Sequence, residues 1–132
     1  MAQQIAEAAL VAQWRDVAGC YSSTRCALDK ALEQGHGLGM SEFEALDRLA
    51  EIPDGQQHMQ RLGEAMYLSQ SALSRVVARL ERDGLVTRGI CPEDRRGVHV
   101  QLTEAGRARH AAAQPTQLAV LQRQFADRAV AR

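Results

Sequence analysis

The sequence contains few of the residues from which metal, redox and catalytic sites are built. Its 132 residues include one Trp, two Tyr, two Phe and three Cys, and Lys30 is the one lysine among 16 cations. The cysteines are an odd number without zinc-site spacing, which favours a reducing cytoplasm over a disulfide framework; they are Cys20, Cys26 and Cys91. The histidines show no ligand-like pairing with each other or with cysteine; they are His36, His58, His99 and His110. We therefore predict no metal site.

Catalytic and membrane signals are also missing. The chain has no HExxH, P-loop, GxSxG or glycine-rich dinucleotide turn, which predicts a protein that is not an enzyme and has no cofactor. The first residues lack a basic leader followed by an apolar core, and no run of about 18 apolar residues occurs. Neither a secretion signal nor a membrane span is predicted. A length of 132 residues predicts a single domain over residues 1–132.

The formal net charge of zero hides a division between the two halves of the chain. Residues 1–68 hold five basic and ten acidic side chains, whereas residues 69–132 hold eleven basic and six acidic ones. An acidic body with a basic face is typical of proteins that bind nucleic acid. Because an ordinary solvated surface can carry the same charges, this division alone does not decide the function.

The basic half begins with a predicted amphipathic helix. Its apolar stripe, at positions i, i+3, i+4 and i+7, consists of Leu73, Val76, Val77 and Leu80. Ser69 precedes this stripe and is the predicted N-cap. The polar positions that lie off the stripe are Gln70, Ser71, Ser74, Arg75, Arg79 and Arg82. This polar side is suited to contact an anionic partner.

A charged β-hairpin follows the helix. The first predicted strand contains Leu85, Val86 and Ile90, and the second alternates Val98, Val100 and Leu102 with His99 and Gln101. The turn between them reads CPEDRRG, which places two arginines at its tip. A DNA duplex has a major groove that admits a helix and a narrower minor groove that attracts arginine. The helix and the hairpin together therefore predict a DNA-binding regulator.

A helix-turn-helix is predicted ahead of the hairpin. Ser41 and Glu44 have the spacing of a capping box that opens one helix, and Pro53 to Gly55 should end it. The residues of this helix that should face inward are Phe43, Leu46, Leu49 and Ala50. A short helix over residues 61–67 then leads through a tight turn into the helix that begins at Ser69.

Two long helices are predicted at the ends of the chain. Residues 4–34 carry a nearly heptad apolar row, Leu10, Trp14, Val17, Tyr21, Leu28 and Leu32. A helix of this length spans about 45 Å, more than so small a domain covers, so we expect its free end to meet another subunit or to fray in solvent. Thr103 should cap the last helix, which Pro115 should kink or divide. This last helix carries an apolar row of its own, Leu118, Leu121, Phe125 and Ala129.

This order of elements, with the string PEDRRGVHVQLTEAGR, resembles the MarR (multiple antibiotic resistance regulator) family of winged-helix transcription factors. The likeness covers about residues 10–130, and its most specific part is the D-x-R signature at Asp94–Arg96 followed by L-T-x-x-G at Leu102–Gly106. It implies a mainly α fold with a small wing hairpin. The winged helix-turn-helix would occupy residues 41–103, between dimerisation helices at residues 4–34 and 104–132.

The resemblance implies a homodimer whose two recognition helices enter successive major grooves of a pseudo-palindromic operator in double-stranded DNA. By position, the groove-facing residues would be Ser69, Gln70, Ser71, Ser74 and Arg75. Asp94 would hold a neighbouring arginine, Arg95 would contact phosphate, and Arg96 would enter the minor groove. Arg79 and Arg82 would contact phosphate or pair with Glu81 and Asp83. Gly63 stands where alanine is common, which should weaken the short helix slightly.

The resemblance also implies a small-molecule effector cleft near the dimer interface, with Trp14 and Tyr21 as candidate lining residues unless they are simply core. A thiol switch at Cys20 or Cys26 is an alternative to their being small buried residues. We interpret the chain as a cytoplasmic, homodimeric, ligand-responsive transcriptional regulator, a repressor rather than an activator. Two alternatives stay open: a winged-helix protein-interaction module without DNA binding, and a thiol-based redox-sensing regulator.

Overall fold

The computed structural model describes the backbone of residues 1–90 and 97–130, and the side chains of these residues as far as Ala126. Helices dominate it, as the sequence predicts. In chain order the elements are α1 Ala2–His36, α2 Met40–Ala50, β1 Gln56–His58, α3 Met59–Met66, α4 Gln70–Arg82, β2 Val86–Ile90, β3 Val98–Leu102 and α5 Glu104–Val130.

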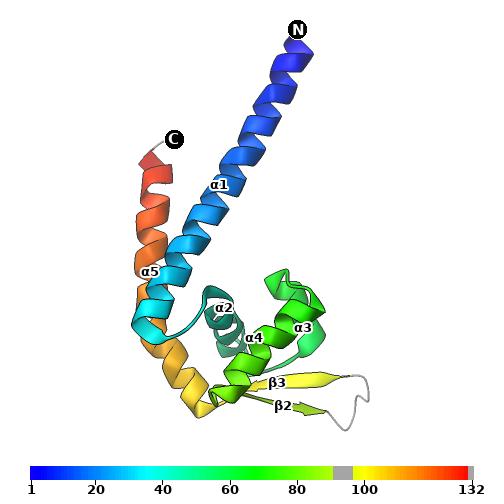
Figure 1. Ribbon diagram of the computed structural model, residues 1–132, viewed down its shortest axis with the longest axis vertical. Helices are drawn as coiled ribbons and strands as arrows, with labels where there is room; N and C mark the ends of the chain where they lie inside the picture. Colours follow the sequence, from blue (N-terminus) through cyan, green and yellow to red (C-terminus); the bar gives the residue numbers. More distant parts are fainter. Residues whose placement is uncertain (91–96, 131–132) are drawn as a thin grey trace.

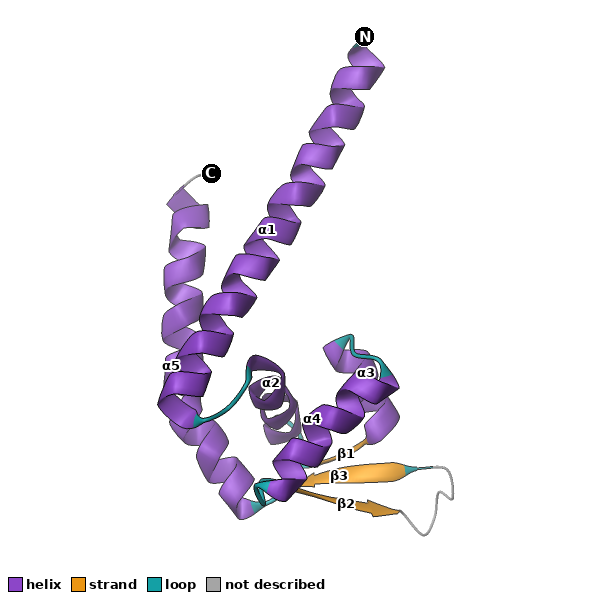
Figure 2. Ribbon diagram, viewed as in Figure 1, coloured by secondary structure: helices purple, strands orange, loops and turns teal. Residues whose placement is uncertain are grey.

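The molecule has a compact body and a long projecting arm (Figure 1). The body contains α2, α3, α4 and the sheet, and α5 runs from the body along the C-terminal part of α1 (Figure 2). The N-terminal turns of α1 extend beyond every other element in these views. We call residues 2–21 of α1 the arm. No helix in the described part of the chain has both the length and the apolar character needed to cross a membrane.

The body has a continuous apolar core, to which its helices, β2, β3 and parts of α1 and α5 contribute. The stripe predicted for α4 faces inward, with Leu73, Val77 and Leu80 fully buried and Val76 packed against them. The other buried members include Leu32, Leu38, Phe43, Leu46, Leu49, Leu62, Leu85, Val86, Val100, Leu102 and Ala113. The periodic pattern of the sequence therefore identified the inward faces of α2 and α4 correctly.

The sheet has three antiparallel strands in the order β1-β3-β2, where the sequence predicted a two-stranded hairpin. Strand β1 pairs with β3, and Gln57 lies opposite Val100 in this register. The prediction missed β1 because QQH has neither β-branched residues nor apolar alternation. It forms because β3 offers a free edge, and its end leads directly into α3.

Two predicted helix caps are confirmed and one is wrong. The Ser69 Oγ accepts a hydrogen bond from the Ala72 N–H at 3.2 Å, and the Thr103 Oγ1 accepts one from the Gly106 N–H at 3.0 Å. Helix α2, however, begins at Met40 after Gly39, so Ser41 lies inside its first turn. The Met40 N–H instead donates to the Asp29 Oδ1 on α1 at 2.9 Å. A side chain from a neighbouring helix thus accepts a hydrogen bond from the first turn of α2, which the capping box was expected to provide.

Helix α1 is slightly longer than predicted, whereas α5 begins at the predicted Glu104 and is described as far as Val130. Gly37 follows the last residue of α1, His36, with a φ of 65°, the left-handed conformation that glycine tolerates. Helix α5 continues through Pro115 and is not divided by it, although its direction changes along its length (Figure 1).

The arm carries an uncovered apolar row. Its large side chains are mostly exposed, at 65%, 68%, 51% and 62% for Leu10, Trp14, Val17 and Tyr21. Farther along the same helix Leu28 is half-buried and Leu32 is fully buried against the body. On α5, Leu118 and Phe125 are also about half exposed, at 50% and 48%. The single chain therefore covers only the C-terminal part of this row.

Candidate nucleic-acid interface

The outer side of α4 presents a set of polar side chains to solvent. Because Leu73, Val77 and Leu80 hold the helix in the core, the opposite side must face outward. The cap at Ser69 fixes where the helix begins. The predicted groove-facing residues of the site, Ser69, Gln70, Ser71, Ser74 and Arg75, are all exposed.

The turn between α3 and α4 is tightly built. Tyr67 ends α3 in the left-handed conformation, with a φ of 57°, and is 93% exposed. Gly63 is buried against α4, and a Cβ placed there would lie 3.1 Å from the Leu73 Cδ2. Glycine at this position therefore has a packing role, since it allows α3 to approach α4 closely; the sequence had suggested only a small loss of helix propensity.

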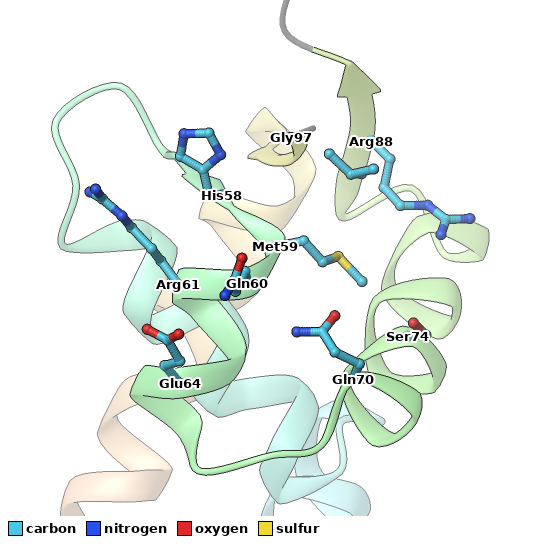
Figure 3. A pocket seen from close by; sticks show the side chains of 10 residues that line it. His58, Met59, Gln60, Arg61, Glu64, Gln70, Ser74, Arg88 and Gly97 are labelled. Carbon is cyan, nitrogen blue, oxygen red and sulfur yellow. The ribbon is translucent and has the colours of Figure 1, made fainter. Parts of the chain in front are cut away.

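An open cleft of about 870 Å³ lies between α3, α4 and the sheet (Figure 3). One flank of α4 borders it through Gln70 and Ser74, and Arg88 borders it from β2. The side of α3 and the edge of the sheet complete the lining with His58, Met59, Gln60, Arg61, Glu64, Gly97 and Val98. Sequence reasoning missed Arg61 and Arg88, because their place beside α4 depends on how the sheet and α3 pack.

The arginines at the C-terminal end of α4 have acidic partners. Arg82 lies 3.7 Å from Asp83, as one of the predicted alternatives has it. Arg79 does not pair with Glu81, because its Nη1 lies 3.3 Å from the Oε1 of Glu42 on α2. Glu81 instead forms an ion pair with Arg88, whose Nη2 lies 2.9 Å from the Glu81 Oε1. The choice of partner follows from tertiary packing, which the spacing along α4 could not reveal.

The histidines also depart from the sequence analysis. The Nε2 atoms of His58 and His99 lie 3.2 Å apart across β1 and β3, so two of the four do pair. His110 is buried and its Nε2 lies 2.7 Å from the Oδ1 of Asp47. Among the described side chains, those of residues 1–90 and 97–126, no group of three or more His, Cys, Asp and Glu could hold a metal ion.

The candidate effector and redox residues are spread along α1. Tyr21 borders a second cleft, of about 270 Å³, together with Arg25, Arg48 and residues of the α3–α4 turn. Trp14 is not among the lining residues of this cleft, because it lies farther out on the arm. Cys20 is half-buried with its Sγ 4.0 Å from the Thr24 Oγ1, and Cys26 is exposed. Cys91, Asp94, Arg95 and Arg96 lie outside the described residues.

A helix-turn-helix followed by a small antiparallel sheet defines the chain as a winged helix-turn-helix protein. Residues 36–97 match the model of the MarR family. The structure of AbsC, a MarR family transcriptional regulator from Streptomyces coelicolor, is 34% identical with a TM-score of 0.80. The alignment covers 88% of this chain and 78% of AbsC. The chain belongs to the MarR family of transcriptional regulators, which are not enzymes.

Two further structures and one sequence relative are informative. Sco3205, a MarR family regulator from Streptomyces coelicolor solved in complex with DNA, is 32% identical with a TM-score of 0.82, over 93% of this chain and 76% of that one. CouR from Rhodococcus jostii RHA1, bound to p-coumaroyl-CoA, is 28% identical with a TM-score of 0.73, over 83% and 75%.

The sequence relative is the HTH-type transcriptional regulator MhqR of Bacillus subtilis, 34% identical over 65% of this chain. The matched segment spans 57% of the length of MhqR.

Proposed function

We propose that this protein is a homodimeric transcriptional repressor that binds a pseudo-palindromic operator and releases it when a small effector binds. The observation that carries the proposal is the capped helix α4, whose exposed face of Gln70, Ser71, Ser74 and Arg75 lies beside an open cleft. The DNA complex of Sco3205, a relative with the same fold, supports this reading.

The chemistry of this face suits the edges of base pairs. A major groove about 12 Å wide admits an α-helix, glutamine can make a bidentate contact to adenine, and arginine can make one to guanine. Serine hydroxyls accept or donate as the base requires. Arg61 and Arg88, at the border of the cleft, are placed to meet phosphates on either side of the helix. Asp94, Arg95 and Arg96 remain predicted wing contacts.

The uncovered apolar rows of α1 and α5 support a homodimer. An exposed row of this kind is expected to bury itself against a second copy, and a twofold arrangement presents the same surface on both subunits. Two recognition helices related in this way match half-sites whose centres are about 34–36 Å apart on DNA. The operator should therefore be an inverted repeat.

A ligand response is supported by the cleft beside Tyr21, which lies between α1, α2 and the α3–α4 turn. Its lining combines aromatic and methionine side chains with Arg25, Arg48 and Glu44; because Glu44 pairs with Arg48, Arg25 is the cation placed to meet an anionic group of an organic molecule. CouR, a relative, was solved with p-coumaroyl-CoA bound. An effector that favours a different arrangement of α1 and the body would lower the population of the DNA-binding form.

The proposal is tested by selecting duplexes from a random pool with the purified protein and titrating the selected duplex in a mobility-shift assay. Gln70→Ala and Arg75→Ala should each weaken binding about tenfold or more, because base contacts are lost. Lys30→Ala removes one positive charge from α1, where the residue is exposed and apart from α4, and should leave the affinity nearly unchanged. Failure to enrich any duplex, or equal losses in all three variants, would contradict the proposal.

A further inference from the structure

Helix α4 has two flanks that border different parts of the molecule. Gln70 and Ser74 border the cleft beside α3 and the sheet. Arg75, Val76, Ala78 and Arg79 border another cleft, of about 420 Å³, whose opposite side is formed by Asp29 and the first turn of α2. Arg79 therefore lies on the side of α4 that faces α2, although it is one of the cations that the sequence placed on the outer face.

The contact across this cleft of about 420 Å³ is an ion pair with one buried member. The Arg79 Nη1 lies 3.3 Å from the Glu42 Oε1, and the exposed fractions of the two side chains are 66% and 9%. Gly39 leaves room for the carboxylate, because a Cβ there would lie 3.2 Å from the same oxygen. A charge held out of water is screened less than a surface charge, so it constrains its partner more strongly.

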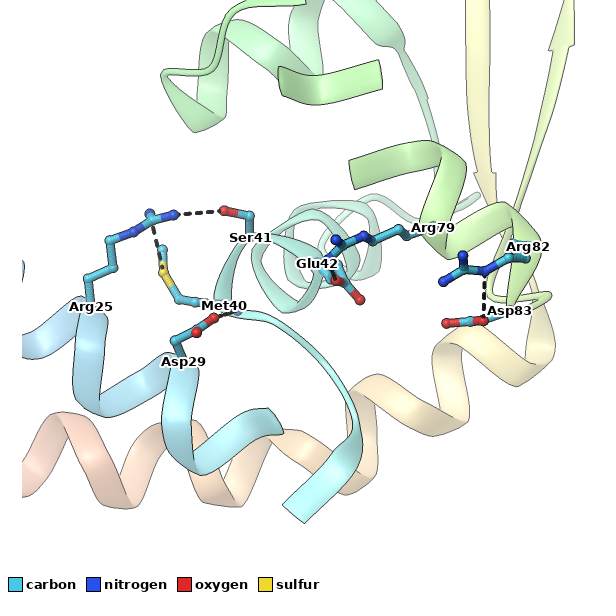
Figure 4. A network of polar contacts seen from close by, with 8 residues as sticks. All are labelled: Arg25, Asp29, Met40, Ser41, Glu42, Arg79, Arg82 and Asp83. Carbon is cyan, nitrogen blue, oxygen red and sulfur yellow. Dashed lines mark hydrogen bonds and ion pairs between the residues drawn. The ribbon is translucent and has the colours of Figure 1, made fainter. Parts of the chain in front are cut away.

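The first turn of α2 is in turn tied to α1 (Figure 4). The Met40 N–H donates to the Asp29 Oδ1 at 2.9 Å, and the Arg25 Nη2 donates to the Ser41 Oγ at 3.2 Å. Consecutive residues of α2, from Met40 to Glu42, thus contact α1 on one side and α4 on the other. This connects the helix that carries the arm with the helix that carries the proposed DNA contacts.

We propose that Glu42 is a positioning residue which, through Arg79, sets the orientation of α4 relative to α1 and so determines how well the protein discriminates its operator. The proposal rests on the proposed function. Arg79 then holds α4 against α2 through Glu42 and does not contact phosphate.

The distance between Arg79 and Gln70 along α4 turns a small rotation of the helix into a large displacement of the proposed DNA contacts. Gln70 lies about 14 Å along the helix axis from Arg79, so a rotation of about 10° at Arg79 moves Gln70 by about 2 Å. Such a shift exceeds the tolerance of a hydrogen bond to a base edge.

Two readings of Arg79 predict different DNA-binding behaviour. If Arg79 contacted phosphate, its loss would weaken binding to every duplex equally and would lower the slope of log K against log salt by about one. If Arg79 is positioned by Glu42 and positions α4, its loss should weaken binding to the selected duplex alone. The salt slope should then stay unchanged, because no phosphate contact is lost.

The experiment compares Glu42→Gln, Arg79→Ala and the double variant on the selected duplex and on a scrambled duplex, over a range of salt concentrations. Each single variant should bind the selected duplex about tenfold more weakly and the scrambled duplex within about twofold of the wild type, with an unchanged salt slope. The double variant should be no worse than either single one, because both remove the same contact. Arg79→Lys keeps a cation near Glu42 and should recover most of the discrimination.

Glu44→Gln is the matched control, since Glu44 pairs with Arg48 within α2 at 3.0 Å and does not reach α4. It should leave discrimination unchanged. If Glu42→Gln does not fold, Arg79→Ala and Arg79→Lys decide the matter, because the Arg79 side chain is largely exposed.

The inference is overturned if Glu42→Gln discriminates as well as the wild type, or if Arg79→Ala weakens both duplexes equally with a lower salt slope. If the wild type itself prefers no duplex, the proposed function fails instead.

Discussion

The arm and the body of this protein have helices with similar apolar spacing, but the apolar row is buried in the body and exposed in the arm. In the body, α4 buries its stripe completely, and Leu73, Val77 and Leu80 have no exposed surface. In the arm, Leu10 and Trp14 repeat at a comparable spacing, yet each is about two-thirds exposed. Periodicity therefore identifies which side of a helix is apolar, but not what covers it.

The same difference appears in how the two regions are packed around glycine. Gly106 lies in the first turn of α5, close to the end of β3 and to the residue before β2, and a Cβ there would overlap the Leu85 carbonyl oxygen and crowd Leu102. Gly19 lies in α1, and a Cβ there would meet nothing within 4 Å. A methyl group therefore has no space at Gly106, whereas at Gly19 it meets open space.

The largest expected effect is that one methyl group changes stability in opposite directions in the two regions. Gly106→Ala should lower the free energy of unfolding by about 3 kcal/mol or more, because the displaced atoms include backbone. Gly19→Ala should raise it by about 0.5–1 kcal/mol, because alanine replaces glycine in a helix interior. Urea denaturation followed by circular dichroism measures both. Destabilisation by Gly19→Ala would show that the arm is already tightly covered in solution.

A second, smaller effect should distinguish the arm from the body by oligomeric state. Trp14→Glu places a charge in the uncovered apolar row and should weaken self-association about tenfold or more. Gln13→Glu adds the same charge to the neighbouring exposed residue of α1 and should leave association nearly unchanged. Sedimentation over a range of protein concentrations measures the dissociation constant. Equal dissociation constants for the two variants would show that this row is not the interface.

Features that depend on neighbouring residues in the sequence were predicted well. The α4 stripe and the Ser69 and Thr103 caps each follow from a few consecutive positions. Their physics is local, since it depends on helix periodicity or on one side-chain hydrogen bond. The fold class followed from the order of these elements.

The predictions that failed all concern partners distant in sequence. Strand β1 requires the edge of β3, about forty residues later, and QQH has no strand pattern of its own. The cap of α2 comes from Asp29 on α1, so the local Ser41 capping box was wrong. Arg79 takes Glu42 on α2 in preference to a neighbour on its own helix. Which of several chemically suitable partners is used depends on the packing of the whole chain.

The smallest expected effect concerns helix starts, which also separate the body from the arm. Helix α4 is preceded by the Ser69 cap, whereas α1, which begins at Ala2, has no side-chain cap and no acidic residue in its first turn. Ser69→Ala should therefore lower the free energy of unfolding by about 1 kcal/mol, because the Ala72 N–H loses its acceptor.

Ser74→Ala, at an exposed position inside the same helix, should change the free energy of unfolding by less than about 0.5 kcal/mol. Urea denaturation measures both variants. If both serine variants had the same stability, the start of α4 would be fixed by its buried stripe alone. The capped body and the uncapped arm would then differ only in what covers their apolar rows.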